Sequence, residues 1–108
     1  YDLTETVAKP TTIALCPIGY WHGYPRSLSS IGSLLIKGRR AKVLGRVSMD
    51  IVAVDVSGMK NLKVGEAATV LGKNGRQEIS ADDLAYLTDT SVYEIVTRLN
   101  PLIKRVYL

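Results

Sequence analysis

The densest group of chemically useful side chains lies in one glycine-rich segment. Residues 19–33 contain three glycines, and within them runs the heptapeptide Tyr20, Trp21, His22, Gly23, Tyr24, Pro25 and Arg26. Its phenol, imidazole and guanidinium groups can donate hydrogen bonds, and the guanidinium keeps a positive charge. This combination suits an anionic ligand such as a phosphate or a carboxylate. A loop whose aromatic rings only pack on the domain is the alternative interpretation.

A second polar group follows at Arg46, Ser48, Met49 and Asp50. Asp50 precedes a strongly apolar run, so its carboxylate is either a candidate ligand or an ordinary turn residue at the start of a strand. Tyr93 offers another phenol, although it lies beside an apolar helical stripe and its ring can serve packing alone. Both interpretations of each residue stay open from the sequence.

Metal, disulfide and thiol chemistry find little support in the composition. The chain has one histidine, His22, and one cysteine, Cys16, so no internal disulfide is possible and too few ligands exist for a zinc or di-iron site. Cys16 lies inside an apolar run, where a thiol packs as a small hydrophobic group. A single cysteine suits a reducing compartment, and we expect a cytoplasmic location.

The elements that must position these residues are mostly strands. The apolar run at 11–18 predicts a largely buried strand, and Asn74-Gly75 predicts a hairpin turn. At 52, 54 and 56 one parity is entirely valine, which indicates a core strand. Further strands are expected at 34–36, 41–45, 47–56, 66–72, 76–79 and, closing the fold, 103–107.

Two helices are predicted near the C-terminus. Ser80 followed by Asp83 resembles a capping box, and Ser91 followed by Glu94 fits the same pattern. Pro101 ends the second helix. Its apolar stripe is Val92, Ile95, Val96 and Leu99.

Together these elements predict a mainly-β fold, a small β-barrel-like or Greek-key domain of five to seven strands with two short helices. A chain of 108 residues, 46% of them hydrophobic, forms one domain over residues 1–108. The net charge of +4 is dispersed, and the basic stretch 37–46 has no interleaved aromatic residue, so no nucleic-acid partner is expected. The apolar runs are too short for a membrane span. The chain does not begin with Met, which suggests a fragment or a processed product.

Five ordered segments resemble one known family. They are Pro17-Ile18-Gly19-Tyr20-x-x-Gly23-Tyr24-Pro25-Arg26, Gly45-Arg46-Val47-Ser48-Met49-Asp50, Val64-Gly65-Glu66 with Glu78-Ile79-Ser80-Ala81-Asp82-Asp83, Tyr93-Glu94-Ile95-Val96-Thr97-Arg98-Leu99 and Lys104-Arg105-Val106-Tyr107. In this order they are similar to alanine racemase, a pyridoxal-phosphate-dependent family of fold type III. Any one of them alone would be a weak signal, whereas together they span nearly the whole chain.

In that family a TIM-like barrel, which carries the cofactor and the lysine that binds it, precedes a mostly β domain. This chain resembles the second domain, so the resemblance implies that a barrel of ~250 residues is missing in front and that the chain alone is inactive. The family's catalytic tyrosine stands nineteen residues before the tyrosine of its G-Y-x-x-G loop, as Tyr1 stands before Tyr20. Asp2, Glu5 and His22 depart from the family pattern, which has Gly, Tyr and usually Asp there.

The chemistry that the resemblance implies is removal of a proton from one face of Cα and its return to the other. Pyridoxal phosphate would act as the electron sink. The barrel's lysine would serve one face and Tyr1 the other. A phenol has a pKa near ~10, so Tyr1 would need a positive neighbour, which an arginine of the barrel supplies in the family.

The other roles are implied by the same resemblance. Tyr20 would contact the cofactor phosphate or line the substrate site, and the Met49 amide would bind the substrate carboxylate, with Asp50 beside it. The corridor that leads to the site would be lined by Arg46, Tyr93 and Arg26. In the family these residues reach the site of the other subunit, so a homodimer is expected.

Three functions follow as expectations. The first is the C-terminal domain of an alanine racemase that interconverts L- and D-alanine for peptidoglycan. The second is a serine or broad-specificity racemase of the same family, which His22 and the altered first segment leave open. The third is a non-catalytic β-domain for binding or dimerisation, and the residues upstream of Tyr1 would discriminate between them.

Overall fold

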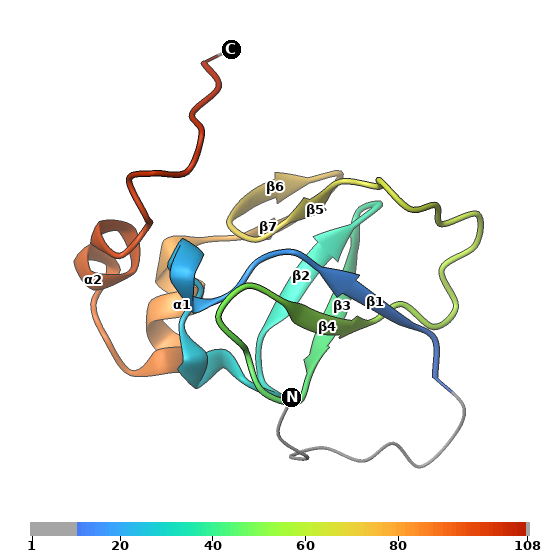
Figure 1. Ribbon diagram of the computed structural model, residues 1–108, viewed down its shortest axis with the longest axis horizontal. Coiled ribbons are helices and arrows are strands. Elements are labelled where there is room, and N and C mark those ends of the chain that lie inside the picture. The colour runs from blue at the N-terminus through green and yellow to red at the C-terminus, as the bar shows by residue number, and fades with distance from the viewer. Residues whose placement is uncertain (1–10, 108) are drawn as a thin grey trace.

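The computed structural model describes residues 11–107 of the chain (Figure 1). Within that range the elements follow one another as β1 (Ile13–Cys16), η1 (Tyr20–His22), η2 (Arg26–Leu28), β2 (Ser33–Ile36), β3 (Arg39–Leu44), β4 (Val52–Asp55), β5 (Ala68–Thr69), β6 (Gly72–Asn74), β7 (Gln77–Ile79), α1 (Ala81–Thr88) and α2 (Val92–Thr97). The elements η1 and η2 are single turns of 3-10 helix in the long loop predicted at 19–33.

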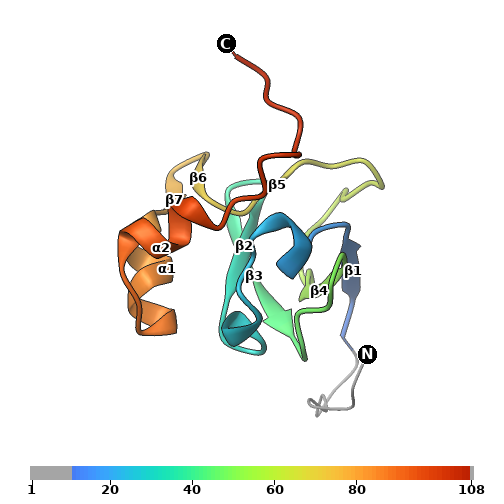
Figure 2. The same cartoon turned by 60° about the vertical axis from the view of Figure 1, so that its left-hand side comes forward.

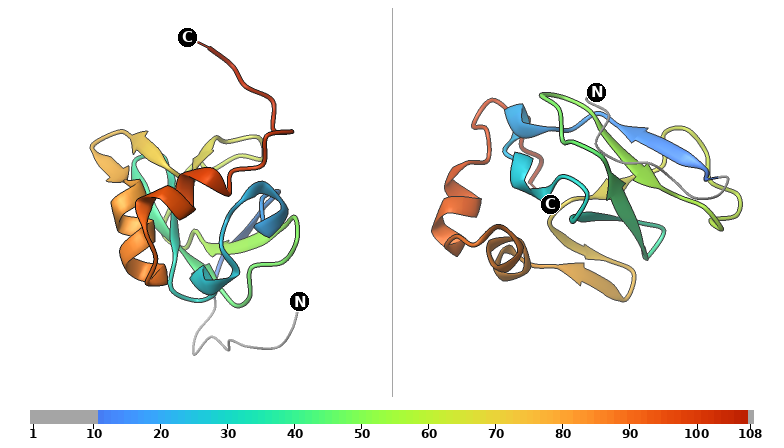
Figure 3. Two further views of the ribbon diagram at one scale, coloured as in Figure 1. Left: turned by 90° about the vertical axis from the view of Figure 1, so that its left-hand side faces the viewer. Right: turned by 90° about the horizontal axis from the view of Figure 1, so that it is seen from below.

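Five strands form one antiparallel sheet in the order β1-β4-β3-β2-β5, and β6 pairs with β7 in a separate ribbon. Strands β2, β3 and β4 are neighbours in chain order, and β1 lies beside β4. Three consecutive strands with the remaining strand returning beside one of them make a Greek key, here with β1 as the strand beside β4. The sheet curls into a half-barrel, as Figure 3 shows from two further directions. The predicted mainly-β, barrel-like fold with two short helices is confirmed.

The core lies between the curled sheet, the ribbon and the helices. Val52, Val54 and Val56 are buried, as the single parity of valines predicted, and Val54 stands in register with Val43 on one side and Ala14 on the other. All three apolar residues of β2 are buried because β7 contacts this strand in addition to its sheet neighbours. Figure 2 shows α1 and α2 packed together beside β2 and β3.

Strand β1 corrects one prediction. The run 11–18 was expected to be largely buried, yet Leu15 is 70% exposed and Ile13 is exposed with it, whereas Cys16 is buried. The reason is that the sheet packs on the core with one face, so Ile13 and Leu15 point outward whereas Cys16 points inward. An apolar run alone does not reveal whether one or both faces of a strand are covered.

Three other predicted strands differ from the structure. The segment 66–72 divides, because β5 joins the large sheet through β2 whereas β6 joins the ribbon. Residues 48–51, predicted as the start of the 47–56 strand, form a turn that Ser48 and Ile51 close by hydrogen bonds. Residues 103–107 form no strand, because this end of the chain leads away from the sheet and pairs with none of its strands (Figure 1).

Both helix starts follow the prediction, by two different arrangements. At α1 the Ser80 hydroxyl accepts from the Asp83 amide at 3.0 Å and the Asp83 carboxylate accepts from the Ser80 amide at 2.8 Å, a complete capping box. The hydrogen bonds from the Ser80 backbone and hydroxyl lower the pKa of Asp83. At α2 Ser91 caps the Glu94 amide, but the Glu94 carboxylate binds Thr90 and Arg98 instead of completing a box.

The apolar stripe of α2 is only partly covered. Ile95 is buried and Val92 half-buried, whereas Val96 and Leu99 are exposed. Across residues 11–107, no helix has the length and apolar character needed to cross a membrane.

Candidate functional site

The two polar groups of the sequence meet in the structure. The Tyr20 amide donates to the Ser48 carbonyl and the Trp21 amide donates to the Met49 carbonyl, both at 3.0 Å. The turn formed by residues 19–23, called the Tyr20 turn below, therefore rests directly on residues 48–51, called the Met49 tip. The sequence predicted both groups as candidates, and the structure brings them together.

Glycine is required where the Tyr20 turn meets its neighbours. A Cβ at Gly19 would overlap the Ser48 carbonyl oxygen and come within 2.6 Å of the Met49 carbonyl carbon. Gly23 has a φ of 106°, and a Cβ there would lie 2.5 Å from the Arg98 carbonyl oxygen. The turn is thus wedged between the Met49 tip on one side and residues 98–100 on the other.

The Met49 tip is a closed turn that presents free amides. The Ser48 amide donates to the Ile51 carbonyl at 3.2 Å, and the Ser48 hydroxyl bridges to the same residue at 2.7 Å. Among the described residues, the amides of Met49 and Asp50 donate no hydrogen bond. Met49 is 51% exposed, and Asp50 is exposed beside it. Two unpaired amides at a surface turn can bind an anionic oxygen.

Asn100 fixes the other side of the turn, and the sequence reasoning missed it. Its side-chain amide donates to the Trp21 carbonyl at 2.9 Å, and its backbone amide donates to the His22 carbonyl at 3.2 Å. The available signal was the dipeptide Asn100-Pro101, which favours a turn after a helix.

The remaining predicted site residues lie at varied distances along the chain from this contact. Arg26 is exposed at the start of η2, and Arg46 is exposed just before the Met49 tip. Tyr93 is 80% exposed in the first turn of α2, the helix whose C-terminal end leads to Asn100. Tyr1 lies outside the described residues.

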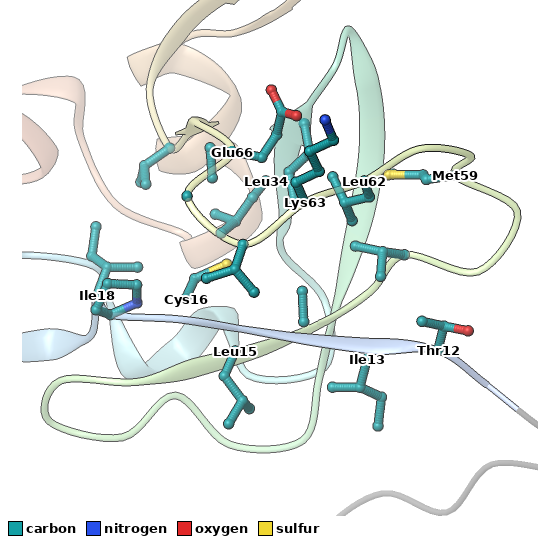
Figure 4. A pocket seen from close by; sticks show the side chains of 18 of the residues that line it. Thr12, Ile13, Leu15, Cys16, Ile18, Leu34, Met59, Leu62, Lys63 and Glu66 are labelled. Atoms are coloured by element: carbon teal, nitrogen blue, oxygen red, sulfur yellow. The ribbon is translucent and has the colours of Figure 1, made fainter.

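A separate hollow lies on the open side of the half-barrel. It is a cavity of about 1010 Å³ between β1, β2 and the connection 56–70, and its walls are mainly apolar (Figure 4). Cys16 and Ile18 face it, whereas Leu15 points to the opposite side of β1. Burial raises the pKa of the Cys16 thiol, which keeps it protonated and poorly nucleophilic. No cluster of metal ligands occurs in the part of the chain that the structure describes.

The chemical capacity of the contact is therefore binding and positioning. Tyr20, which is 43% exposed, offers a phenol, and the Met49 tip offers backbone donors; both suit phosphate or carboxylate oxygens. Neither the Tyr20 turn nor the Met49 tip contains a lysine or a cysteine. A Schiff base with a carbonyl cofactor at this place therefore needs a lysine supplied from elsewhere.

Known proteins match this chain along its whole length. The family profile "Alanine racemase, C-terminal domain" matches residues 1–107. An alanine racemase from Methylacidiphilum infernorum is 43% identical over 107 residues, which are 99% of this chain and 28% of that protein. The chain thus spans little more than a quarter of this relative.

Solved structures match equally well. The alanine racemase from Streptomyces coelicolor superposes with a TM-score of 0.81 at 41% identity, covering 91% of this chain and 25% of that one. The alanine racemase from Bartonella henselae, solved with covalently bound pyridoxal phosphate, superposes with a TM-score of 0.89 at 28% identity, covering 100% of this chain and 29% of that one.

The fold is a mainly-β domain with a curled half-barrel sheet and two short helices, and its exposed backbone amides and phenol are suited to binding. The chain belongs to the alanine racemase C-terminal domain family.

Proposed function

We propose that this chain acts as the C-terminal domain of a pyridoxal-phosphate-dependent alanine racemase that interconverts L- and D-alanine. The observation that carries the proposal is the contact between the Tyr20 turn and the Met49 tip, with its unpaired amides, in a chain of this family. In this proposal the domain binds and orients the substrate, and a separate barrel holds the cofactor.

The donors of the contact fit the anionic groups involved. The backbone amides of Met49 and Asp50 can donate hydrogen bonds to the carboxylate of an amino acid, and the exposed Tyr20 phenol can donate one to a phosphate oxygen. Pyridoxal phosphate, when bound, supplies the electron sink that makes the Cα proton removable. We assign the Met49 amide to the substrate carboxylate, Asp50 to its flank, and Tyr20 to the cofactor phosphate or the substrate wall.

The proton that returns to Cα is assigned to Tyr1. Racemisation needs an acid–base group on each face of the carbon, and Tyr1 serves the face opposite the barrel's lysine. A neighbouring positive charge, from the barrel, lowers the pKa of such a phenol enough for it to act as a base. Arg46, Tyr93 and Arg26 line the corridor to the site.

Assembly is part of the proposal. The Tyr20 phenol and the Met49 tip lie at the surface of the described domain, so they can reach a site on another chain. We assign them to the partner subunit of a homodimer in the cytoplasm, where the product D-alanine feeds peptidoglycan synthesis.

The test uses a chimera in which this chain replaces the matching C-terminal segment of the Methylacidiphilum infernorum racemase. We expect the chimera to racemise alanine in both directions. Tyr1→Phe should lower both rates by about 10²- to 10⁴-fold, the contribution of one general acid–base group. Unchanged rates in both directions would remove Tyr1 from the reaction, and an inactive chimera that still dimerises and holds its cofactor would contradict the proposed function.

A second pair of variants isolates the Met49 amide. Met49→Pro removes the N–H, and it should raise the KM for alanine by roughly 10-fold or more, the weight of a hydrogen bond to a charged group. Met49→Ala keeps the N–H and should raise it much less. Equal KM values for the two variants, at equal melting temperatures, would exclude the amide. Serine offered in place of alanine tests whether the substrate range is broader.

A further inference from the structure

The His22 side chain folds back onto the start of its own turn. Its Nδ1 atom accepts a hydrogen bond from the Gly19 amide at 3.1 Å. Gly19 is buried, and within the described residues this imidazole nitrogen is the acceptor of its amide. A ring nitrogen can accept only while it carries no proton, so the bond requires neutral His22 with its hydrogen on Nε2.

The same turn carries the contact on which the site is built. The amides after Gly19 donate to Ser48 and Met49, and the carbonyls of Trp21 and His22 accept from Asn100. Within the turn, the amides of His22 and Tyr24 donate to the Gly19 carbonyl at 3.0 and 3.2 Å, and the Gly23 amide donates to the Tyr20 carbonyl at 3.1 Å. The His22 side chain adds the bond that satisfies the buried Gly19 amide.

We propose that His22 is a positioning residue whose neutral imidazole holds the Tyr20 turn against the Met49 tip, so that the geometry of the site follows the protonation of His22. The inference rests on the proposed function, since the site that it regulates is the racemase site. Protonation at Nδ1 places two donors face to face and leaves a buried amide without an acceptor. Such a loss lowers the population of the closed turn by roughly 5- to 100-fold.

The effect of His22 must be distinguished from that of the charged groups on the segments that pack against the turn. The Met49 tip carries Asp50, and the segment leading to Asn100 carries Arg98, which is paired with Glu94 at 2.6 Å. The Trp21 ring lies against the imidazole edge to face, with 4.9 Å between ring centroids, and it is uncharged.

The test follows the Gly19 amide by nuclear magnetic resonance in the full chain. On acidification we expect the exchange protection of the Gly19 amide, corrected for its intrinsic rate, to fall at least about 10-fold, while the Val54 amide of β4 stays protected. His22→Asn places an amide oxygen where Nδ1 accepts, and it should keep Gly19 protected throughout. His22→Ala should leave it unprotected throughout.

Two control variants assign the titration. Asp50→Asn and Glu94→Gln should both keep the wild-type profile. The inference is overturned by a flat Gly19 profile, by an equal fall in His22→Asn, or by loss of the fall in Asp50→Asn or Glu94→Gln.

The chimera supplies an independent arm. As the pH is lowered, kcat/KM of the chimera should fall more steeply than kcat/KM of its His22→Asn variant. An active chimera with an unchanged acidic limb in His22→Asn overturns this inference and leaves the proposed function standing. If the Gly19 amide shows the predicted profile but the chimera is inactive, the role of His22 in the turn stands and the proposed function fails.

Discussion

Tyr24 is the most deeply buried phenol of the described residues. It is 2% exposed, and its hydroxyl finds no hydrogen-bond partner there. Burial raises the pKa of this hydroxyl, because an ionised phenol would lose its hydration. The ring anchors the chain directly after the Tyr20 turn, whereas the oxygen adds only a desolvation cost. The second tyrosine of the G-Y-x-x-G-Y motif is therefore a packing residue, and the first, Tyr20, is the exposed one.

Replacing Tyr24 by Phe should cost nothing. At neutral pH we expect the free energy of unfolding to stay equal or to rise by up to about 1 kcal/mol, since a buried unpaired group is removed. Tyr24→Ala should lose about 3–5 kcal/mol, as large aromatic truncations do. Urea unfolding measures both, and a loss above about 2 kcal/mol in Tyr24→Phe would mean that the hydroxyl is satisfied after all.

Tyr24 also sets a pH dependence. Because its folded pKa is raised, its contribution to stability is complete below the unfolded value of ~10 and is lost as the pH rises above it. The wild-type chain should therefore lose stability above about pH 10 more steeply than Tyr24→Phe. Parallel alkaline curves for the two proteins would contradict this.

Among the elements, the β6–β7 ribbon is joined to the sheet by side-chain hydrogen bonds. The Arg40 guanidinium of β3 donates to the Glu78 carbonyl of β7 at 3.0 Å, and Asn74 makes the larger set. Asn74 accepts from the Gly38 amide at 2.9 Å and donates to the Leu35 carbonyl and the Thr69 hydroxyl, both at 3.2 Å. One amide group thus joins the turn of the β2–β3 hairpin, strand β5 and the ribbon. A carboxylate at this position could accept but could not donate.

Asn74→Asp should therefore destabilise the fold by about 1–3 kcal/mol, because the Leu35 carbonyl loses its donor and meets a negative charge. Lys73→Ala, one residue earlier on the exposed side of β6, is the matched control and should stay within about 0.5 kcal/mol. Thermal or urea unfolding distinguishes them. An Asn74→Asp protein as stable as the control would show that the Asn74 hydrogen bonds do not hold the ribbon, which would leave its apolar contacts and the Arg40–Glu78 bond.

The start of α1 gives a prediction for a helix. Ser80→Ala should lower the free energy of unfolding by about 1 kcal/mol, and Ser80→Gly by only a few tenths.

Asp83→Asn should lower the melting temperature at neutral pH. Since the folded pKa of Asp83 is lowered, its contribution is present above the unfolded value of ~3.9 and is lost as the pH falls through the folded value. The Asp83→Asn difference should vanish in acid, and a constant difference would assign it to packing.

Local signals accounted for most of the elements. Asn74-Gly75, the valine parity of β4 and the serine caps at 80 and 91 act over a few residues, and each was confirmed. The exposed face of β1 depends on which face of the sheet is covered, and the division of 66–72 depends on which sheet receives each part. The missing strand at 103–107 depends on where the fold places that end of the chain. That choice is made by the whole fold, so a local pattern does not contain it.

At the scale of the whole molecule, the site residues were named by resemblance and only partly gathered by the fold. The structure joins the Tyr20 turn to the Met49 tip, whereas none of the hydrogen bonds or ion pairs described above links Arg26 or Tyr93 to that contact. The role of Asn100 was missed because 79 residues of chain separate it from Trp21, whose carbonyl its side chain binds. Tertiary closure places such partners together.

The 108-residue chain alone should neither racemise alanine nor develop a cofactor absorbance band with pyridoxal phosphate. Its binding groups are backbone amides and a phenol, and the turn and tip that carry them lack a lysine. Absorbance titration and a racemisation assay on the chain and on the chimera make the comparison. A cofactor band in the chain alone would contradict the division of labour proposed here.

The crossing of backbones at Gly19 and Gly23 has a consequence for how such a domain is recognised. Any sequence that threads this turn between residues 48–49 and 98–99 must leave both positions without a side chain, whatever reaction it serves. The glycines of the motif therefore report a crossing of three chain segments. A related protein that had lost every catalytic group could still keep the motif intact. Finding the motif in a sequence therefore indicates this backbone crossing, and it does not by itself indicate the reaction.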